Sequence, residues 1–415
     1  MKVTVVGAGS TYTPELVSGL SRERESLELD QLVLHDIDVE RREVVGGLAG
    51  RMLQRQGFGG KLEVTGEIDR ALEGADFVLI QIRVGGQAAR LQDETVPLAC
   101  GCIGQETTGA GGFAKAMRTV PVVLELAERA RDLAAPGAWI VDFTNPVGIV
   151  TRALLDAGHR AVGLCNVAIT FQRRIAQLTG VEAGRVRVDQ VGLNHLTWIR
   201  AVWVDDRDVL GELLDAHGDV LAAEIELPRA LLDDLGAIPS YYLRYFYAEG
   251  EVQEEQRAGT PRAQTVAQIE RELLAMYRDE TLTEKPELLE RRGGAFYSEA
   301  ATQLVSSLAA GREDVQVVDV RNGRTLAGLE PDDVVEVPAR IGGDGAVPVE
   351  QAPLAPELLG LVQHVAAYER LTAEAAVTRD RATARRALLA NPLVREYANA
   401  EQLLDALLDP AAARS

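Results

Sequence analysis

The sequence has 415 residues and a formal net charge of −20, because 63 acidic side chains outnumber 43 basic ones. At roughly 150 residues per domain, the length predicts about two or three domains with a core large enough to need no disulfide or metal. The hydrophobic share of 47% and charged share of 26% argue against disorder and collagen-like fibres. The acidic balance argues against binding nucleic acid or anionic membranes by overall charge, yet it permits a local basic pocket.

The apolar run that ends at Gly7 is too short for the core of a signal peptide, and no apolar run approaches the length of a membrane span. Three cysteines are too few for a disulfide framework and fit a reducing compartment. We therefore expect a soluble, cytoplasmic protein.

The first part of the chain alternates short runs rich in Val, Ile and Leu with amphipathic segments. The predicted strands are residues 3–6, 32–35, 77–81, 139–143 and 161–164, and the predicted helices begin near 13 or cover 39–56 and 115–133. This alternation predicts an α/β fold with a Rossmann-type doubly wound parallel sheet. We assign residues 1–166 to a dinucleotide-binding domain.

The pattern changes after residue 166. We predict a helix over 169–178, strands over 186–191, 197–204 and 334–337, and mostly helical stretches over 209–277 and 356–408. Residues 316–329 read as a hairpin with Asn322 and Gly323 as a two-residue turn. These elements predict a tightly packed α+β domain over 167–415 for substrate, metal and oligomerisation.

A glycine turn follows the first predicted strand and opens a helix. Gly7 and Gly9 would let backbone N–H groups approach a pyrophosphate at the positive end of that helix, although Tyr12 replaces the usual third glycine. Asp36 ends the second strand, where an acid accepts hydrogen bonds from ribose hydroxyls and favours NAD over NADP. An ordinary tight turn, with Asp36 as a helix N-cap, is the alternative. The candidate cofactor-binding residues are Gly7, Gly9, Ser10, Thr11, Asp36 and Arg83.

Three segments, at 81–94, 103–112 and 143–146, carry Arg, Glu, Thr and Asn side chains at or after predicted strand ends, and the first two contain glycines. Each one alone is compatible with a solvated loop, but together at one sheet edge they favour a substrate pocket. Paired arginines at 291 and 292 are candidates for holding a phosphate, or a charge cluster at a helix end.

Cys165 and His195 offer a thiolate and an imidazole, which suit a borderline transition metal in an open catalytic site. A small core cysteine and a core histidine are the alternatives. Residues 241–247 are dense in aromatics; most should serve packing, while one tyrosine becomes a base if a metal or other cation lowers its pKa.

Together these segments resemble the family 4 glycoside hydrolases, most closely the 6-phospho-β-glucosidases. The resemblance extends from the glycine turn to about residue 337. Its specific motifs are Gln-Glu-Thr-Thr-Gly at 105–109, Cys-Asn at 165–166, Asn-His at 194–195 and Arg-Gly-Gly-Ala at 292–295. This NAD-dependent family is an exception to hydrolysis by two carboxylates.

The resemblance implies a redox-assisted elimination. NAD⁺ would take a hydride from C3 of the sugar, a divalent metal, usually Mn²⁺, would polarise the C2 and C3 oxygens, and a tyrosine would remove the C2 proton. The leaving group would then depart from C1, water would add, and the hydride would return. NAD is thus implied as a recycled cofactor.

The resemblance also implies roles for single residues. Cys165 and His195 match the metal ligands, and Tyr242 matches the base, although the adjacent Tyr241 leaves the register open. Asn166 stands where the α-glycoside branch carries an acidic Asp, which favours the β-branch. The implied substrate-binding residues are Arg90, Glu106, Asn145, Asn166 and Arg292.

The implied substrate is a phosphorylated disaccharide or aryl glucoside, and the implied assembly is a homodimer or homotetramer. The sequence leaves open the choice between gluco and galacto sugars, the aglycone and the metal. Two other functions compete on the same fold, namely a conventional NAD-dependent hydroxy-acid dehydrogenase and a non-enzymatic NAD-binding sensor.

Overall fold

The computed structural model describes residues 1–293 and 296–408, so Gly294 and Ala295 of the predicted phosphate motif lie outside the described residues. Six parallel strands follow the order β3-β2-β1-β4-β5-β6, the order of a dinucleotide-binding sheet. They are β1 (Lys2–Val6), β2 (Gln31–His35), β3 (Lys61–Thr65), β4 (Phe77–Ile80), β5 (Trp139–Asp142) and β6 (Ala161–Gly163). The predicted Rossmann-type sheet is confirmed.

Burial explains which of these strands could be predicted. Every residue of β4 is buried, as expected for a central parallel strand with helices on both faces. β3 was not predicted, because it is a partly exposed edge strand that carries Lys61 and Glu63 among its apolar residues.

Helices connect the parallel strands. They are α1 (Thr13–Arg22), α2 (Val39–Arg55), α3 (Ile68–Leu72), α4 (Gly86–Ala99), α5 (Gly109–Leu133), α6 (Val147–Asp156) and α7 (Val167–Thr179). α5 begins earlier than predicted and includes the glycine-rich segment. Asp38 caps α2, because its side chain accepts a hydrogen bond from the Arg41 N–H at 3.0 Å. The N-cap role considered for Asp36 therefore falls to Asp38.

The sheet continues past β6 as antiparallel strands, so one sheet crosses the predicted domain boundary at 166. The continuation, in spatial order, is β11 (Asp314–Arg321), β12 (Val334–Gly342), β7 (Val186–Leu193), β8 (Leu196–Val204) and β10 (Ile238–Pro239). Two further strands lie off this path, β9 (Arg207–Asp208) and β13 (Gly345–Pro348).

The predicted hairpin at Asn322 and Gly323 is wrong. β11 pairs with β12 across a long loop over 322–333, so no strand begins directly after Gly323. The Asn322 side chain builds this loop, since its Oδ1 accepts from the Leu326 N–H at 2.8 Å and its Nδ2 donates to loop carbonyls. An asparagine that folds a longer loop through its side chain has the same local sequence as a hairpin turn.

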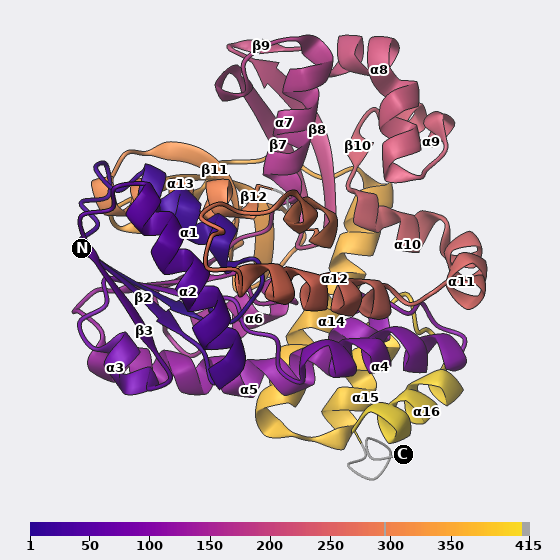
Figure 1. Cartoon of the computed structure of the whole chain (residues 1–415). Coiled ribbons are helices and arrows are strands. Elements are labelled where there is room, and N and C mark those ends of the chain that lie inside the picture. The colour runs from indigo at the N-terminus through magenta and orange to yellow at the C-terminus, as the bar shows by residue number, and fades with distance from the viewer. Residues whose placement is uncertain (294–295, 409–415) are drawn as a thin grey trace.

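The remaining α-helices lie in the later part of the chain. They are α8 (Leu210–Ile225), α9 (Arg229–Leu235), α10 (Arg244–Tyr247), α11 (Glu249–Ala258), α12 (Arg262–Tyr277), α13 (Tyr297–Ala310), α14 (Pro356–Thr378), α15 (Arg381–Ala390) and α16 (Tyr397–Leu408). α12 runs beside α2 and α4 of the N-terminal part (Figure 1). Leu48 and Met52 of α2 form a buried cluster with Ile269 and Leu273 of α12. This contact places α12 against the dinucleotide-binding part.

None of the helices in the described ranges combines the length and apolar character that crossing a membrane requires.

Candidate active site

A cavity of about 1150 Å³ opens at the carboxyl ends of the parallel strands. Its walls come from the β1–α1 turn, the loops after β2, β4 and β5, the tyrosines of the short helix η2 (Tyr241–Leu243), and α12. Open α/β sheets bind ligands at this edge. The cavity is therefore the candidate active site.

The glycine turn packs too closely against its neighbours to accept side chains. Gly7 has φ +90°, and a Cβ there would lie 2.8 Å from the carbonyl oxygen of Gln81. A Cβ on Gly9 would lie 2.7 Å from the carboxylate of Asp36. Glycine at both positions leaves the backbone at the start of α1 open to the cavity, where a pyrophosphate would bind.

Asp36 lies beside this turn. Its Oδ2 accepts from the Gly9 N–H at 2.7 Å and its Oδ1 accepts from the Asp38 N–H at 2.9 Å. Each carboxylate oxygen keeps capacity for a further hydrogen bond, so Asp36 can still hold ribose hydroxyls. Its charge would also repel a 2′-phosphate.

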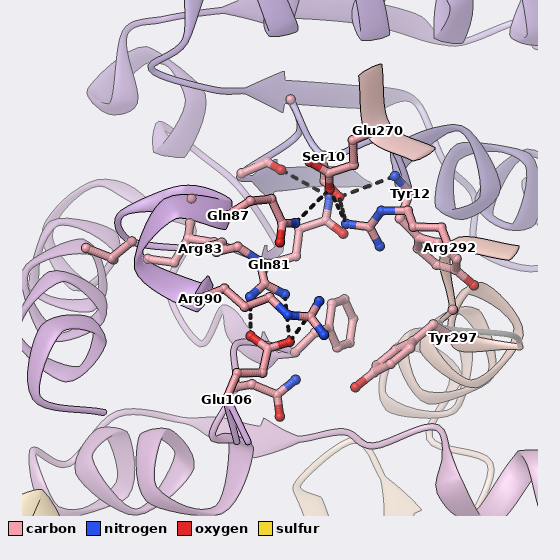
Figure 2. A pocket seen from close by; sticks show the side chains of 18 of the residues that line it. Ser10, Tyr12, Gln81, Arg83, Gln87, Arg90, Glu106, Glu270, Arg292 and Tyr297 are labelled. Atoms are coloured by element: carbon pink, nitrogen blue, oxygen red, sulfur yellow. Dashed lines mark hydrogen bonds and ion pairs between the residues drawn. The ribbon is translucent and has the colours of Figure 1, made fainter. Parts of the chain in front are cut away.

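Glu106 pairs with three cations, of which Arg83 and Arg90 are labelled in Figure 2. Its Oε2 pairs with Lys115 Nζ at 2.7 Å, its Oε1 pairs with Arg90 Nη1 at 3.2 Å, and Arg83 binds both oxygens. Glu94 provides a second acid, whose Oε1 accepts from Arg90 Nε at 2.7 Å. We call Arg83, Arg90, Glu106 and Lys115 the Glu106 cluster; it carries one anion and three cations on the cavity wall, which favours an anionic ligand.

Burial and neighbouring charges shift the pKa values of Glu106 and Lys115. Burial alone would raise the pKa of Glu106, but the charges of Lys115, Arg83 and Arg90 outweigh it and hold the pKa well below its usual value. Burial and then the Arg83 charge lower the pKa of Lys115 to about 8, against the attraction of Glu106. Lys115 was not singled out in the sequence, because it lies inside a helix.

We expect the affinity for a sugar phosphate to fall as the pH rises through about 8. Lys115 loses its charge there, so the cavity loses one cation; the loss should be on the order of tenfold. Calorimetric titration of glucose 6-phosphate in the presence of NAD⁺ measures it. Lys115→Arg stays charged across this range and should remove the pH dependence. A wild-type affinity that is constant through this range contradicts the role of Lys115.

Folding stability should respond to Lys115 in the opposite sense. The folded protein binds the Lys115 proton less tightly than the unfolded chain, because the pKa falls from 10.5 to about 8. The charging penalty is therefore present below about 8 and is relieved as the pH rises towards 10.5.

A second ion cluster, around Glu270, joins the glycine turn to α12 and Arg292 (Figure 2). Glu270 of α12 accepts from Arg292 Nη2 at 3.1 Å, from Gln87 Nε2 at 3.2 Å and from Arg41 Nη2 at 3.4 Å. Arg41 Nε donates to the Gly9 carbonyl at 2.9 Å, and Arg292 Nη2 lies 3.5 Å from Ser10 Oγ. Arg292 therefore sits beside the cofactor turn as well as the predicted substrate pocket.

His195 occupies the turn between β7 and β8 and faces the cavity. It is buried, and burial is the main cause that lowers its pKa to about 3, so the imidazole is neutral at ordinary pH. Its Nδ1 has no hydrogen-bond partner among the described residues. A neutral, unpartnered imidazole nitrogen is what a metal ion requires.

Cys165 follows β6 and lines a separate cavity of about 100 Å³. Burial, followed by the charges of Glu336 and Asp319, raises the pKa of this thiol well above its usual value, so it stays protonated unless a metal binds. No group of three or more His, Cys, Asp or Glu side chains within 1–293 and 296–408 is arranged to hold a metal. Within these ranges Cys165 and His195 therefore lack the further protein ligands that a closed structural metal site requires.

Two tyrosines of η2 line the cavity next to His195. The Tyr242 ring stacks on the imidazole with centroids 3.6 Å apart and planes 12° apart. The Tyr241 ring lies 4.8 Å from Tyr242 and stacks on Phe171 at 6.4 Å. Burial raises the pKa of Tyr242 well above its usual value, and Tyr241 and Cys165 add to the rise. A cation bound at His195 would act in the opposite direction.

The structure brings most of the predicted site residues to one cavity. Those that line it are Gly7, Gly9, Ser10, Asp36, Arg83, Arg90, Glu106, Asn145, Asn166, His195, Tyr242 and Arg292. Asn145 Oδ1 is buried and has no partner among the described residues. Two predicted residues do not line this cavity: Cys165, as above, and Thr11, which is buried and whose carbonyl accepts from the Tyr277 hydroxyl at 2.7 Å.

Arg41 and Glu270 were missed together with Lys115. Arg41 follows Asp36 closely in a charged run, which gave a weak signal for a cofactor-site residue. Glu270 reaches Arg41 across 229 residues of sequence, and nothing in its helical neighbourhood distinguishes it from a solvated glutamate.

Comparison with known proteins agrees with this geometry. Residues 2–181 match the family 4 glycosyl hydrolase model, and residues 190–394 match its C-terminal domain. A probable 6-phospho-β-glucosidase of Bacillus subtilis is 40% identical over 427 residues, which cover 99% of this chain and 96% of that protein.

Solved structures give the same result. The 6-phospho-β-glucosidase of Thermotoga maritima with NAD and glucose 6-phosphate superposes with a TM-score of 0.92 at 35% identity, covering 100% of this chain and 98% of that one. A second structure of that enzyme, with manganese, NAD⁺ and glucose 6-phosphate, superposes with a TM-score of 0.91 at 34% identity, covering 98% of this chain and 97% of that one. A malate dehydrogenase of Plasmodium falciparum superposes with a TM-score of 0.56 at 15% identity, covering 91% of this chain and 98% of that one. This likeness shows the fold alone.

Proposed function

The chain belongs to the family 4 glycosyl hydrolases, and from this premise we propose that it hydrolyses 6-phospho-β-glucosides with NAD and a divalent metal, Mn²⁺ in the first instance. The observation that carries the proposal is the single cavity that joins the glycine turn, the cationic Glu106 cluster and the stacked pair of His195 and Tyr242. A hydroxy-acid dehydrogenase would have no use for this pair beside Cys165.

The chain's own groups divide the work. Asp36 and the Gly7–Gly9 turn hold the cofactor, and Cys165 and His195 hold the metal. When bound, NAD supplies a hydride acceptor for C3 of the sugar, and the metal supplies Lewis-acid polarisation of the C2 and C3 oxygens. Tyr242 takes the C2 proton. Asn166 cannot serve as an acid, so the leaving oxygen takes its proton from water or from another group.

The substrate phosphate binds to the arginines of the cavity. Arg90 and Arg292 are mostly buried. The acids Glu94, Glu106 and Glu270 pair with these two arginines and also with Arg41, Arg83 and Lys115, so five cations face three carboxylates. Buried guanidinium groups bind phosphate strongly because they form paired, charge-assisted hydrogen bonds. This requirement for phosphate separates the proposal from an ordinary β-glucosidase.

Removing the phosphate from an aryl β-glucoside substrate should raise KM on the order of 100-fold or more, since two charge-assisted contacts are lost. Steady-state kinetics on the phosphorylated and plain glucosides measures the ratio. Arg292→Met should shrink that ratio, whereas Arg291→Met, at the exposed neighbouring position, should leave it unchanged. An equal KM for both substrates would overturn the phosphate site.

Three finer assignments belong to this proposal. Aryl 6-phosphoglucosides are accepted as well as disaccharide phosphates. The assembly is a homodimer or homotetramer, as the resemblance to the family implies. The location is the cytoplasm, which the three free, buried cysteines support.

A further inference from the structure

The turn that carries His195 has a backbone that its own sequence does not favour. The turn joins β7 to β8, whose residues Leu193 and Leu196 pair directly. His195 has φ +63°, a left-handed conformation that is unfavourable for a residue other than glycine. Such a conformation persists only where surrounding contacts stabilise it, so this turn requires contacts from neighbouring elements.

Glu336 of β12 holds the turn from one side. Its Oε1 accepts from Gln190 Nε2 at 2.6 Å, and its Oε2 accepts from Asn194 Nδ2 at 2.9 Å. All three side chains are buried. The Glu336 backbone pairs with Gly192, midway between the two amides, so both carboxylate oxygens reach the same hairpin.

Asn194 connects this carboxylate to both proposed metal ligands. It precedes His195 in the chain, and its side chain lies near enough to the Cys165 thiol to oppose the rise in pKa that burial causes there. Glu336 therefore holds an amide that belongs to the residue before His195 and lies near the Cys165 thiol.

A buried carboxylate is a costly way to fill this space. An apolar side chain of similar size would avoid the desolvation penalty, and Asp319, directly opposite Glu336 in the β11–β12 ladder, adds like-charge repulsion. The two hydrogen bonds that Glu336 accepts from the hairpin offset this cost.

We propose that Glu336 is a positioning residue for the metal site, which fixes the Asn194 amide and, through it, the placement of His195 and Cys165. The inference rests on the proposed metal ligands. It predicts that the shape of the acceptor matters and that its negative charge does not.

Two substitutions separate shape from charge. Glu336→Leu leaves both amides without an acceptor. Glu336→Gln keeps an oxygen that accepts from Asn194. The Gln190 side-chain amide can rotate so that its Oε1, which has no partner among the described residues of the wild type, accepts from the new N–H₂ group. Glu369→Gln is the matched control, because Glu369 is a buried acid of the same region that makes no hydrogen bond to the hairpin among the described residues.

The experiment is a titration of the whole protein with Co²⁺ in place of the native metal. The signal recorded is the charge-transfer absorption between the thiolate and the bound cobalt. Glu336→Leu should weaken Co²⁺ binding by roughly 10–100-fold, as loss of a ligand-orienting group does, while NAD⁺ affinity stays unchanged. Glu336→Gln and Glu369→Gln should bind Co²⁺ like the wild type. Because Glu336→Leu is a core substitution that can prevent folding, Asn194→Ala breaks the same link from the other side and should show the same loss.

The outcomes distinguish this inference from the function beneath it. Unchanged Co²⁺ affinity in folded Glu336→Leu or Asn194→Ala, even with a lowered Tm, would show a merely structural role and overturn the positioning role alone. A loss in Glu336→Gln as large as in Glu336→Leu would overturn it too. If the wild type itself shows no charge-transfer band, the metal site of the proposed function fails as well.

Discussion

Replacing Tyr242 by Phe should reduce kcat by roughly 10²–10⁴-fold, the usual contribution of a positioned general base. Phe keeps the aromatic ring that stacks on His195 at 3.6 Å, so the metal ligand should stay in place. Exchange of the C2 proton with D₂O during turnover, followed by NMR of the product, reports the step directly, and it should fall with kcat.

Tyr241→Phe is the matched control for this prediction. Both hydroxyls belong to buried rings that line the same cavity, but the Tyr241 ring stacks on Phe171 away from the imidazole. We expect a smaller loss of kcat and retained C2 exchange. A larger loss in Tyr241→Phe than in Tyr242→Phe would transfer the base to Tyr241, which the sequence alone left open.

Replacing Cys165 by Ser should weaken Mn²⁺ binding by at least about 100-fold, beyond the loss expected for a supporting hydrogen bond, and should remove most activity. A hydroxyl is a poorer ligand than a thiolate for a borderline metal. Metal affinity from calorimetry, measured beside NAD⁺ affinity, separates this effect from misfolding, because NAD⁺ binding should be unchanged.

Cys102→Ser provides the comparison for Cys165→Ser. Cys102 is also buried, lines neither cavity, and has polar neighbours in the Cys100 carbonyl and Asn399 Nδ2, each at 3.9 Å, that can accommodate a hydroxyl. It should bind Mn²⁺ and turn over like the wild type. Full Mn²⁺-dependent turnover in Cys165→Ser would show that the thiol is not a ligand.

The parts of the fold that could be predicted are those that local sequence dictates. Fully buried parallel strands such as β4 appear as short apolar runs, and the Gly7–Gly9 turn is marked by its glycines. The edge strand β3 was missed because exposure allows charged residues there. The hairpin at Asn322 was wrong because side-chain hydrogen bonds over 322–333 give the same residues a longer loop.

The candidate site divides in the same way. Residues with distinctive chemistry next to strand ends, such as Cys165 and His195, stand out in the sequence and could be predicted as candidates. Lys115, Glu270 and Glu336 were not, because their neighbours come from distant segments: Glu336 meets Gln190 across 146 residues and Asn194 across 142. Their roles follow from packing between elements, which no local pattern records.

The pairing of charges also accounts for how an acidic protein can bind an anionic sugar and an anionic cofactor. The net charge of −20 repels anions from the surface as a whole. In the cavity, the Glu106 cluster and the Arg41–Arg292 pair around Glu270 concentrate cations within low-dielectric walls, where their attraction is stronger than in water.

In the redox-assisted hydrolysis proposed for this chain, NAD is recycled. The direct measurement is release of the aryl group from an aryl β-glucoside 6-phosphate, recorded together with absorbance of NADH, after NAD⁺ and Mn²⁺ have been removed and added back singly and together. We predict turnover only when both are present, with no net NADH accumulating over many turnovers. Steady accumulation of NADH in proportion to product, or full turnover without either cofactor, would contradict the account.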